Sequence, residues 1–206
     1  MLGFWNKSVY ITYLGAFWAV FGLLMFLKTD NVDFAFLGMI LAAVCDMFDG
    51  KVARNLENRS EQEKDFGVQI DSLADIVAFI VVPAITIYKI GLNEVYHLVL
   101  LSFYVIAGII RLAYFNVCMS NKNEAIKTYL GLPVPVAVLI YGLVWLCAKF
   151  IPFVYNNEIL IYTILVPVVG YLHISKIKIK KFTGNWFYAA VTILAFIALI
   201  LGIFVL

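Results

Sequence analysis

The chain has 206 residues, of which 64% are hydrophobic and only 14% are charged. Soluble domains carry about 25% charged residues, so this composition excludes an ordinary water-soluble protein and is typical of an integral membrane protein. The net charge of +2 is too small to favour nucleic acid binding. The three cysteines have no paired spacing, which argues against a disulfide framework and against a zinc site.

Long apolar segments follow one another along the chain. A transmembrane helix needs about 20 predominantly apolar residues, and such windows occur at 9–27, 34–54, 67–88, 95–117, 132–150, 157–175 and 185–206. The first window lacks a small-residue cleavage site, so we expect a retained helix rather than a signal peptide. We predict an all-α integral membrane protein of about seven transmembrane helices, in a single domain of residues 1–206.

The basic residues predict an orientation, because Lys and Arg are enriched in cytoplasmic loops. With the N-terminus in the cytoplasm, only Lys28, Lys89 and Lys149 fall on the far side, and the other twelve Lys and Arg residues fall on the cytoplasmic side. The run KIKIKK at 176–181 is either an ordinary cytoplasmic loop of this kind or a contact for anionic lipid headgroups.

The second apolar segment ends in CDMFDGKVARN, at 45–55, which brings carboxylates to the cytoplasmic end of a predicted membrane helix. Residues three and four positions apart share one face of a helix. Asp46, Asp49, Gly50 and Ala53 therefore form one stripe. Arg54 follows it and adds a planar donor that suits a phosphate group.

The third apolar segment begins with a matching stripe. Gly67, Asp71 and Asp75 are spaced by four in FGVQIDSLAD, so they share a face of the next helix. A short loop makes the two helices antiparallel neighbours, and the four carboxylates are expected to converge. Ionisable residues at membrane depth normally face an interior cavity and find a partner there.

Two interpretations of the converging carboxylates remain open. They are either a divalent cation site or acidic groups at the wet ends of helices, where negative charge is favoured near N-termini. An all-oxygen ligand set favours Mg²⁺, Mn²⁺ or Ca²⁺ over zinc. The small residues between the acids permit close helix packing or close approach of a ligand. Bound metal ions, the guanidinium group of Arg54 and a surface of small residues would together suit a phosphorylated ligand.

The spacing D-x-x-D-G-x-x-A-R followed by G-x-x-x-D-x-x-x-D resembles the signature of the CDP-alcohol phosphotransferases, and all of its fixed positions are matched. The loop from Arg54 to Gly67 holds twelve residues, which is longer than is usual in that family. It has Lys64 where the family often has Ser or Thr. The added residues are polar, so both helical stripes are preserved.

The resemblance implies a fold, a chemistry and a set of roles. It implies a six-helix membrane core, with 185–206 peripheral to it, and two divalent cations, Mg²⁺ or Mn²⁺. A CDP-linked lipid such as CDP-diacylglycerol would be the donor, and members are commonly homodimers. The implied metal ligands are Asp46, Asp49, Asp71 and Asp75, of which Asp75 is also the base, and the residues implied to face the CDP moiety are Gly50, Ala53, Arg54 and Gly67.

Further stretches are similar to the serine-using branch of this family, the phosphatidylserine synthases. They are DSLAD at 71–75, RLAYFNV at 111–117, YLGLPVPVA at 129–137 and YLHISKIKIKKF at 171–182. This likeness implies serine as the acceptor, with Arg111, Asn116 and Thr12 as candidates for the acceptor or the lipid phosphate. Simpler interpretations are that Arg111 reaches the interface and that Pro133 and Pro135 begin a helix.

Alternative functions are another acceptor alcohol, such as glycerol 3-phosphate or an inositol phosphate, and a cation channel or transporter. A channel or transporter predicts polar residues that continue to the far side of the membrane. The carboxylates are instead confined to one end of the predicted helices, which favours the enzyme.

Overall fold

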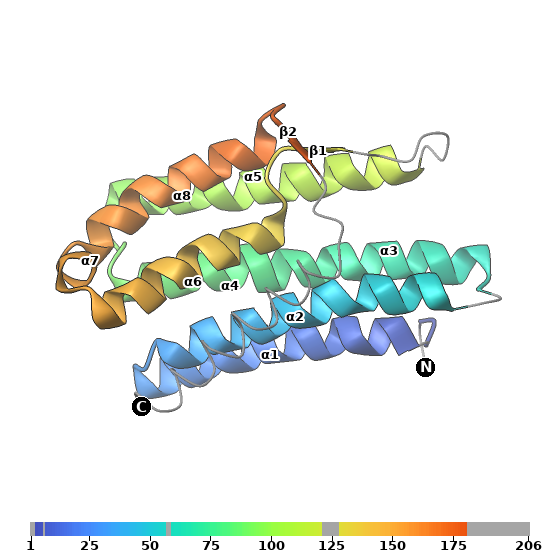
Figure 1. Cartoon of the computed structure of the whole chain (residues 1–206), viewed down its shortest axis with the longest axis horizontal. Coiled ribbons are helices and arrows are strands. Elements are labelled where there is room, and N and C mark those ends of the chain that lie inside the picture. Colours follow the sequence, from blue (N-terminus) through green and yellow to red (C-terminus); the bar gives the residue numbers. More distant parts are fainter. Residues whose placement is uncertain (1–2, 6, 57–58, 121–127, 181–206) are drawn as a thin grey trace. The chain divides into compact units, whose positions relative to one another are not determined.

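The computed structural model describes residues 3–5, 7–56, 59–120 and 128–180, which are almost entirely helical (Figure 1). The helices are α1 (Lys7–Thr29), α2 (Asp33–Asn55), α3 (Glu61–Asp75), the π-helix Ile76–Val81, α4 (Val82–Ile90), α5 (Val95–Ser120), α6 (Val134–Phe150), α7 (Pro152–Asn156) and α8 (Glu158–Ile174). Two short strands, β1 (Thr128–Leu130) and β2 (Lys178–Lys180), form an antiparallel pair. The described residues divide into two compact units, one up to Ala78 and one from Phe79 to Lys180.

The predicted all-helical architecture is confirmed for the described residues, apart from the strand pair, which was not predicted. Helices occupy six of the seven predicted windows, and the seventh, 185–206, lies outside the described residues. Three helical segments are long and apolar enough to cross a membrane, namely Ser8–Thr29, Glu61–Ile90 and Val95–Cys118. Helices α6 and α8 are apolar but shorter. Three such segments indicate a membrane protein.

In the first unit, α1 and α2 approach so closely that backbone packs against backbone. A Cβ atom added to Gly38 would lie 2.4 Å from the Trp18 carbonyl oxygen and 3.0 Å from Gly22 Cα. One added to Gly22 would lie 2.4 Å from the Phe34 carbonyl oxygen. In lipid, small residues let helices reach van der Waals contact without a hydrophobic driving force. The glycine pair therefore fixes the separation of these two helices.

Helix α3 begins at Glu61, before the predicted apolar window, because a capping box precedes that window. The Ser60 side chain accepts a hydrogen bond from the Glu63 N–H at 3.2 Å, and the Glu63 carboxylate accepts one from the Ser60 N–H at 2.8 Å. This reciprocal pair satisfies two backbone donors that the first turn would leave unpaired. The polar loop thus contributes the first turns of the helix that carries Asp71 and Asp75.

In the second unit, a proline disturbs the regular helix and a tyrosine compensates for it. Pro83 has no N–H, so it cannot donate to the carbonyl of Phe79 four residues earlier, and the backbone there is a π-helix. The hydroxyl of Tyr104, on α5, donates to that carbonyl at 2.7 Å, and both side chains are fully buried. The hydrogen bond ties α5 to the segment just before α4.

The strand pair lies in the second unit next to the GLPVP segment, since β1 directly precedes Gly131. Gly131 follows β1 with φ of 73°, and a Cβ there would lie 2.5 Å from the His173 carbonyl oxygen. Only glycine accommodates both the left-handed backbone and this approach. Pro133 is the residue that precedes α6 and Pro135 lies in its first turn. The helix-start interpretation of these two prolines is therefore confirmed.

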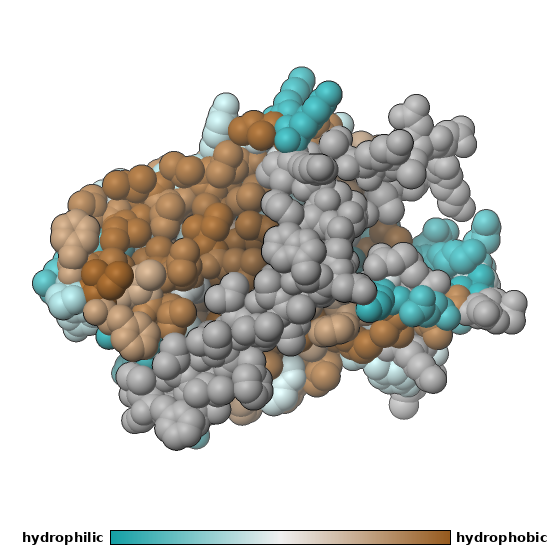
Figure 2. Space-filling view, in the orientation of Figure 1, coloured by the Kyte–Doolittle hydropathy of each residue, from teal (hydrophilic) through white to brown (hydrophobic). Residues whose placement is uncertain are grey.

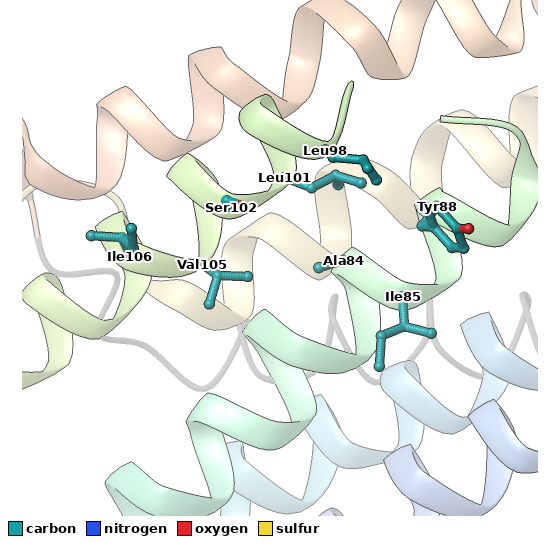
Figure 3. Close-up of a pocket in the computed structure, with 8 residues that line it drawn as sticks. All are labelled: Ala84, Ile85, Tyr88, Leu98, Leu101, Ser102, Val105 and Ile106. Atoms are coloured by element: carbon teal, nitrogen blue, oxygen red, sulfur yellow. The ribbon is translucent and has the colours of Figure 1, made fainter. Parts of the chain in front are cut away.

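The surface of the second unit is apolar along its helices. Figure 2 shows hydrophobic residues over α6 and α8, with hydrophilic side chains gathered at the β1–β2 end. Between α4 and α5 an open groove of about 390 Å³ is lined by apolar side chains such as Ile85, Leu101 and Val105 (Figure 3). Such a surface suits contact with hydrocarbon rather than with water.

The glycine contact between α1 and α2 generates a stability prediction. Gly38→Ala places a methyl group where the Trp18 carbonyl oxygen already lies, so the helices must separate. Overpacking of this kind costs about 1–3 kcal/mol, or a few degrees in melting temperature. Gly142→Ala is the matched control on α6, since a Cβ there meets no atom within 4 Å. Thermal unfolding in detergent checks both variants, and equal melting temperatures for the two would contradict the packing argument.

Candidate active site

Three of the four predicted carboxylates converge in the first unit. Asp46 and Asp49 come from the last turns of α2, and Asp71 comes from the end of α3. One carboxylate oxygen from each lies within 4.8 Å of the others. Asp49 is buried and the other two are partly exposed. The two stripes inferred from spacing alone therefore face each other across the antiparallel pair.

The fourth carboxylate, Asp75, lies one turn beyond Asp71 on α3 and within hydrogen-bonding reach of Asp46. It shares a face of α3 with Asp71, because the two residues are four positions apart. All four aspartates therefore belong to one cluster at the end of α2 and α3. This places a candidate base beside the candidate ligands.

One further contact holds Asp49. The hydroxyl of Thr12, on α1, donates a hydrogen bond to its Oδ2 atom at 2.6 Å. Thr12 was predicted as a residue for the acceptor or the lipid phosphate. In the structure its hydroxyl contacts a carboxylate, so α1 contributes a polar side chain to the same cluster.

The small residues of the motif lie beside an arginine that the sequence analysis did not select. Arg59 Nη1 donates to the Ala53 carbonyl oxygen at 3.1 Å, and Nη2 donates to the Glu63 carbonyl oxygen at 3.3 Å. Nη2 is also 2.9 Å from the position that a Cβ on Gly67 would take. Arg59 therefore covers two of the motif positions expected to face the CDP moiety. Arg54, also expected there, is on α2, and its side chain is outside the described part of the chain.

The sequence gives only a weak indication of a role for Arg59, because this residue lies in the longer loop rather than in the motif. It directly precedes Ser60, whose capping box fixes where α3 begins. That cap places Arg59 immediately before α3, where its side chain reaches the Glu63 carbonyl oxygen in the first turn. An arginine adjacent to an N-cap, in a loop between two site helices, is the only sequence feature that points to it.

The remaining predicted residues belong to the second unit. Arg111, on α5, is buried and its Nε–H donates to the Leu132 carbonyl oxygen. His173, on α8, is buried as well, and its Nδ1 lies 2.9 Å from the same oxygen. Asn116 lies half-buried further along α5. Arg111 is thus held inside the unit, and the interpretation that it extends to the interface is not supported by its burial.

The donor set of the cluster fits a hard divalent cation. Such ions bind carboxylate oxygens at about 2.0–2.6 Å, so two oxygens on one ion are separated by less than about 5 Å, as they are among Asp46, Asp49 and Asp71. No nitrogen or sulfur atom belongs to this group of three residues, which disfavours zinc. Held cations would offset the mutual repulsion of the carboxylates and could bind the phosphates of a ligand.

Comparison with known proteins supplies the assignment. The family model described as CDP-alcohol phosphatidyltransferase matches residues 5–170. A CDP-diacylglycerol–serine O-phosphatidyltransferase of Saccharomyces cerevisiae is 34% identical over 156 residues, which cover 70% of this chain and 55% of the relative. The enzyme of that name from Bacillus subtilis is 34% identical over 153 residues, 73% of this chain and 75% of the relative. An archaetidylserine synthase of Methanothermobacter thermautotrophicus is 36% identical over 110 residues, 53% of this chain and 45% of the relative.

The helices and the carboxylate cluster together define a helical membrane protein with a group of acidic residues that could hold a metal ion. The chain belongs to the CDP-alcohol phosphatidyltransferase family. Members of this family generally depend on divalent metal ions. The matched region spans about half the length of the yeast relative and three quarters of the Bacillus one.

The carboxylate cluster predicts opposite effects of one substitution with and without metal. Asp71→Asn removes one of three converging negative charges, so the metal-free protein should melt a few degrees higher. The same change removes a ligand, so added Mg²⁺ or Mn²⁺ should no longer raise the melting temperature as it does for the wild type. Asp65→Asn, an exposed carboxylate earlier on α3, is the control. A metal-induced shift that survives Asp71→Asn would contradict the assignment.

Proposed function

We propose that this protein transfers a phosphatidyl group from CDP-diacylglycerol to the hydroxyl group of L-serine, giving phosphatidylserine and CMP. The serine oxygen forms a bond to the phosphorus distal to cytidine, and the bond from that phosphorus to the oxygen of CMP breaks. The proton of the serine hydroxyl goes to a carboxylate. Protons and charge balance without an oxidant or a reductant.

The observation that carries the proposal is the convergence of Asp46, Asp49 and Asp71 within 4.8 Å in a chain that matches this family over residues 5–170. The names of the relatives support serine as the acceptor, since both the diacylglycerol and the archaeal enzymes are serine transferases by name. A chain that binds only structural cations would have no need for a base beside the cluster, where Asp75 lies.

The four aspartates divide the chemistry between them. Asp46, Asp49 and Asp71, with Asp75 as a further ligand, would hold two divalent cations, Mg²⁺ or Mn²⁺, and such ions would supply the positive charge that offsets the pyrophosphate. Asp75 takes the proton of the attacking hydroxyl. Its place one turn beyond Asp71 on α3, within reach of Asp46, puts its carboxyl group at the cluster. The cluster thereby holds the donor and the base in one place.

The CDP moiety binds on the face formed by Gly50, Ala53, Gly67 and Arg54, to which we add Arg59. The contacts of Arg59 with Ala53 and beside Gly67 support this addition. A guanidinium group offers planar donors that match phosphate oxygens. Exchange of the Ala53 carbonyl for a phosphate oxygen would replace a neutral acceptor with an anionic one, which strengthens the hydrogen bond of the guanidinium group.

Serine needs a cation for its carboxylate, and we propose Arg111 for this role. We propose Asn116 as the residue that accepts a hydrogen bond from the ammonium group of serine. Arg111 is buried, and its bond to the Leu132 carbonyl oxygen fixes the orientation of its guanidinium group. A buried and oriented arginine loses little conformational entropy when it binds a carboxylate. The acceptor is zwitterionic, so one basic residue suffices.

We further propose that residues 1–206 act as one membrane domain, with the N-terminus and the site on the cytoplasmic side of the cell membrane. The distribution of Lys and Arg supports this orientation. The segment 185–206 would be a seventh, peripheral span, and the protein would work as a homodimer, as the family does.

The decisive experiment measures CMP release by the purified, detergent-solubilised protein with CDP-diacylglycerol and Mg²⁺ or Mn²⁺. Serine, glycerol 3-phosphate and an inositol phosphate are added separately. Only serine should give CMP, EDTA should abolish the release, and Asp75→Asn should lower kcat by about 10²–10⁴-fold. Asp65→Asn serves as the control for an exposed carboxylate on the same helix.

The acceptor series separates the alternatives. Release with glycerol 3-phosphate or an inositol phosphate alone would keep the family chemistry and overturn serine. If the protein binds metal but none of the three acceptors gives CMP release, the result would point instead to the cation channel or transporter interpretation.

Arg59 generates a separate prediction about donor binding. Arg59→Gln should raise the KM for CDP-diacylglycerol by about 10-fold or more, because hydrogen bonds to charged groups are worth about 1.5–3 kcal/mol. The KM for serine should not change. Lys64→Gln, a loss of the same charge at an exposed position on α3, is the matched control. Equal donor KM values for the two variants would count against Arg59.

A further inference from the structure

We propose that Thr12 is a positioning residue for the metal site, which holds the Asp49 carboxylate in the orientation that binds a divalent cation. The inference rests on the proposed site of Asp46, Asp49 and Asp71. It assigns a role to α1, which otherwise contributes no residue to the cluster among those selected for metal or CDP binding.

The hydrogen bond itself is short and shielded from water. Thr12 Oγ1 lies 2.6 Å from Asp49 Oδ2, which is the distance of a charge-assisted O–H···O⁻ bond. The Thr12 side chain is 8% exposed and that of Asp49 is 6% exposed. A charge-assisted bond is strengthened where water is excluded.

The burial of Thr12 does not by itself require this bond. The Ser8 carbonyl oxygen, one turn earlier on α1, lies 3.2 Å from the same hydroxyl and is an alternative acceptor. Thr29 on the same helix uses that pattern, with its hydroxyl 2.7 Å from the Met25 carbonyl oxygen. The hydroxyl of Thr12 has one proton, and the shorter and charged contact takes it. The bond to Asp49 therefore serves the carboxylate.

A close approach of the two helices makes the bond possible. One turn after Thr12, a Cβ on Gly15 would lie 3.0 Å from Cys45 Cβ and 3.4 Å from the Ala42 carbonyl oxygen. With glycine at this position, α1 lies against the turn of α2 that precedes Asp46 and Asp49. The short Thr12 side chain then reaches Asp49 directly.

Orientation of one oxygen decides how the carboxylate meets a cation. With Oδ2 held by Thr12, Oδ1 keeps a fixed direction, and the carboxylate does not have to be reoriented when an ion binds. Loss of a hydrogen-bond partner behind a metal ligand typically weakens metal affinity by 10–100-fold. The carboxylate itself remains, so binding should weaken rather than vanish.

The test is Mn²⁺ binding by the metal-free, detergent-solubilised full chain, followed by electron paramagnetic resonance of the free ion. Thr12→Val, which keeps the shape and removes the hydroxyl, should weaken Mn²⁺ binding by about 10–100-fold. Thr12→Ser should restore affinity close to that of the wild type. Thr29→Val is the control, since it removes a hydroxyl from the same helix whose hydrogen-bond partners are backbone groups, the Met25 carbonyl oxygen and the Asn31 N–H.

Kinetics provide a second and independent measurement. The Mn²⁺ concentration for half-maximal CMP release should rise in Thr12→Val, while kcat at saturating Mn²⁺ stays near the wild-type value. A purely structural role would lower the melting temperature and leave both Mn²⁺ constants unchanged. If Thr12→Val does not give monodisperse protein, Thr12→Ala provides the same comparison with Thr12→Ser.

The outcomes separate this inference from the proposed function. Mn²⁺ binding by Thr12→Val that equals the wild type overturns the inference, whatever the enzyme does. Weakened binding together with no CMP release from the wild type with any acceptor supports the role of Thr12 and overturns the transferase. A wild type that binds no Mn²⁺ overturns the inference and the metal site together.

Discussion

Repulsion among the carboxylates of Asp46, Asp49 and Asp71 is the constraint on which the first unit depends. Carboxylates that lie within 4.8 Å of one another at the end of apolar helices repel each other, and a bound cation would offset this repulsion. The backbone and the neighbouring side chains must therefore hold the carboxylates together. The hydrogen bond from Thr12 to Asp49 and the close packing of α1 against α2 supply that restraint.

Small residues make the restraint possible. Along the contact of α1 with α2, Gly15, Gly22 and Gly38 all stand where a Cβ would meet the opposite helix. In hydrocarbon, where water does not drive helices together, association depends on such close packing and on hydrogen bonds. The same contact that fixes the helix separation thus also brings the Thr12 hydroxyl to Asp49. Stability and site geometry share one interface.

Three sequence stretches that lie far apart along the chain meet at one atom in the second unit. The Leu132 carbonyl oxygen, in GLPVP, accepts the Nε–H of Arg111 from RLAYFNV and lies 2.9 Å from Nδ1 of His173 in YLHIS. Gly131 allows this approach because its backbone is left-handed and has no side chain. A buried arginine needs hydrogen-bond partners, and this junction provides one. The three stretches therefore share one polar contact.

The sequence by itself determined the helical membrane architecture, the two acidic stripes and the family. Apolar windows and the i, i+3, i+4 spacing of Asp46, Asp49, Asp71 and Asp75 are local properties of a helix, and the structure confirms that these side chains gather. Helix α3 begins at Glu61, before the predicted apolar window that starts at 67, because the Ser60 capping box extends the helix into the polar loop.

Only the tertiary structure decided the contacts between segments far apart in the chain. Thr12 bonds to Asp49, which is 37 positions away in the chain. Tyr104 bonds to the carbonyl oxygen of Phe79, which is 25 positions away and to which Pro83 cannot donate. Arg59 reaches Ala53 and Gly67 from a loop whose sequence carries no motif. Helix periodicity states which residues share a face, but the partner of that face depends on how closely two helices approach. That distance is set by packing of glycine against backbone, which spacing along one helix does not encode.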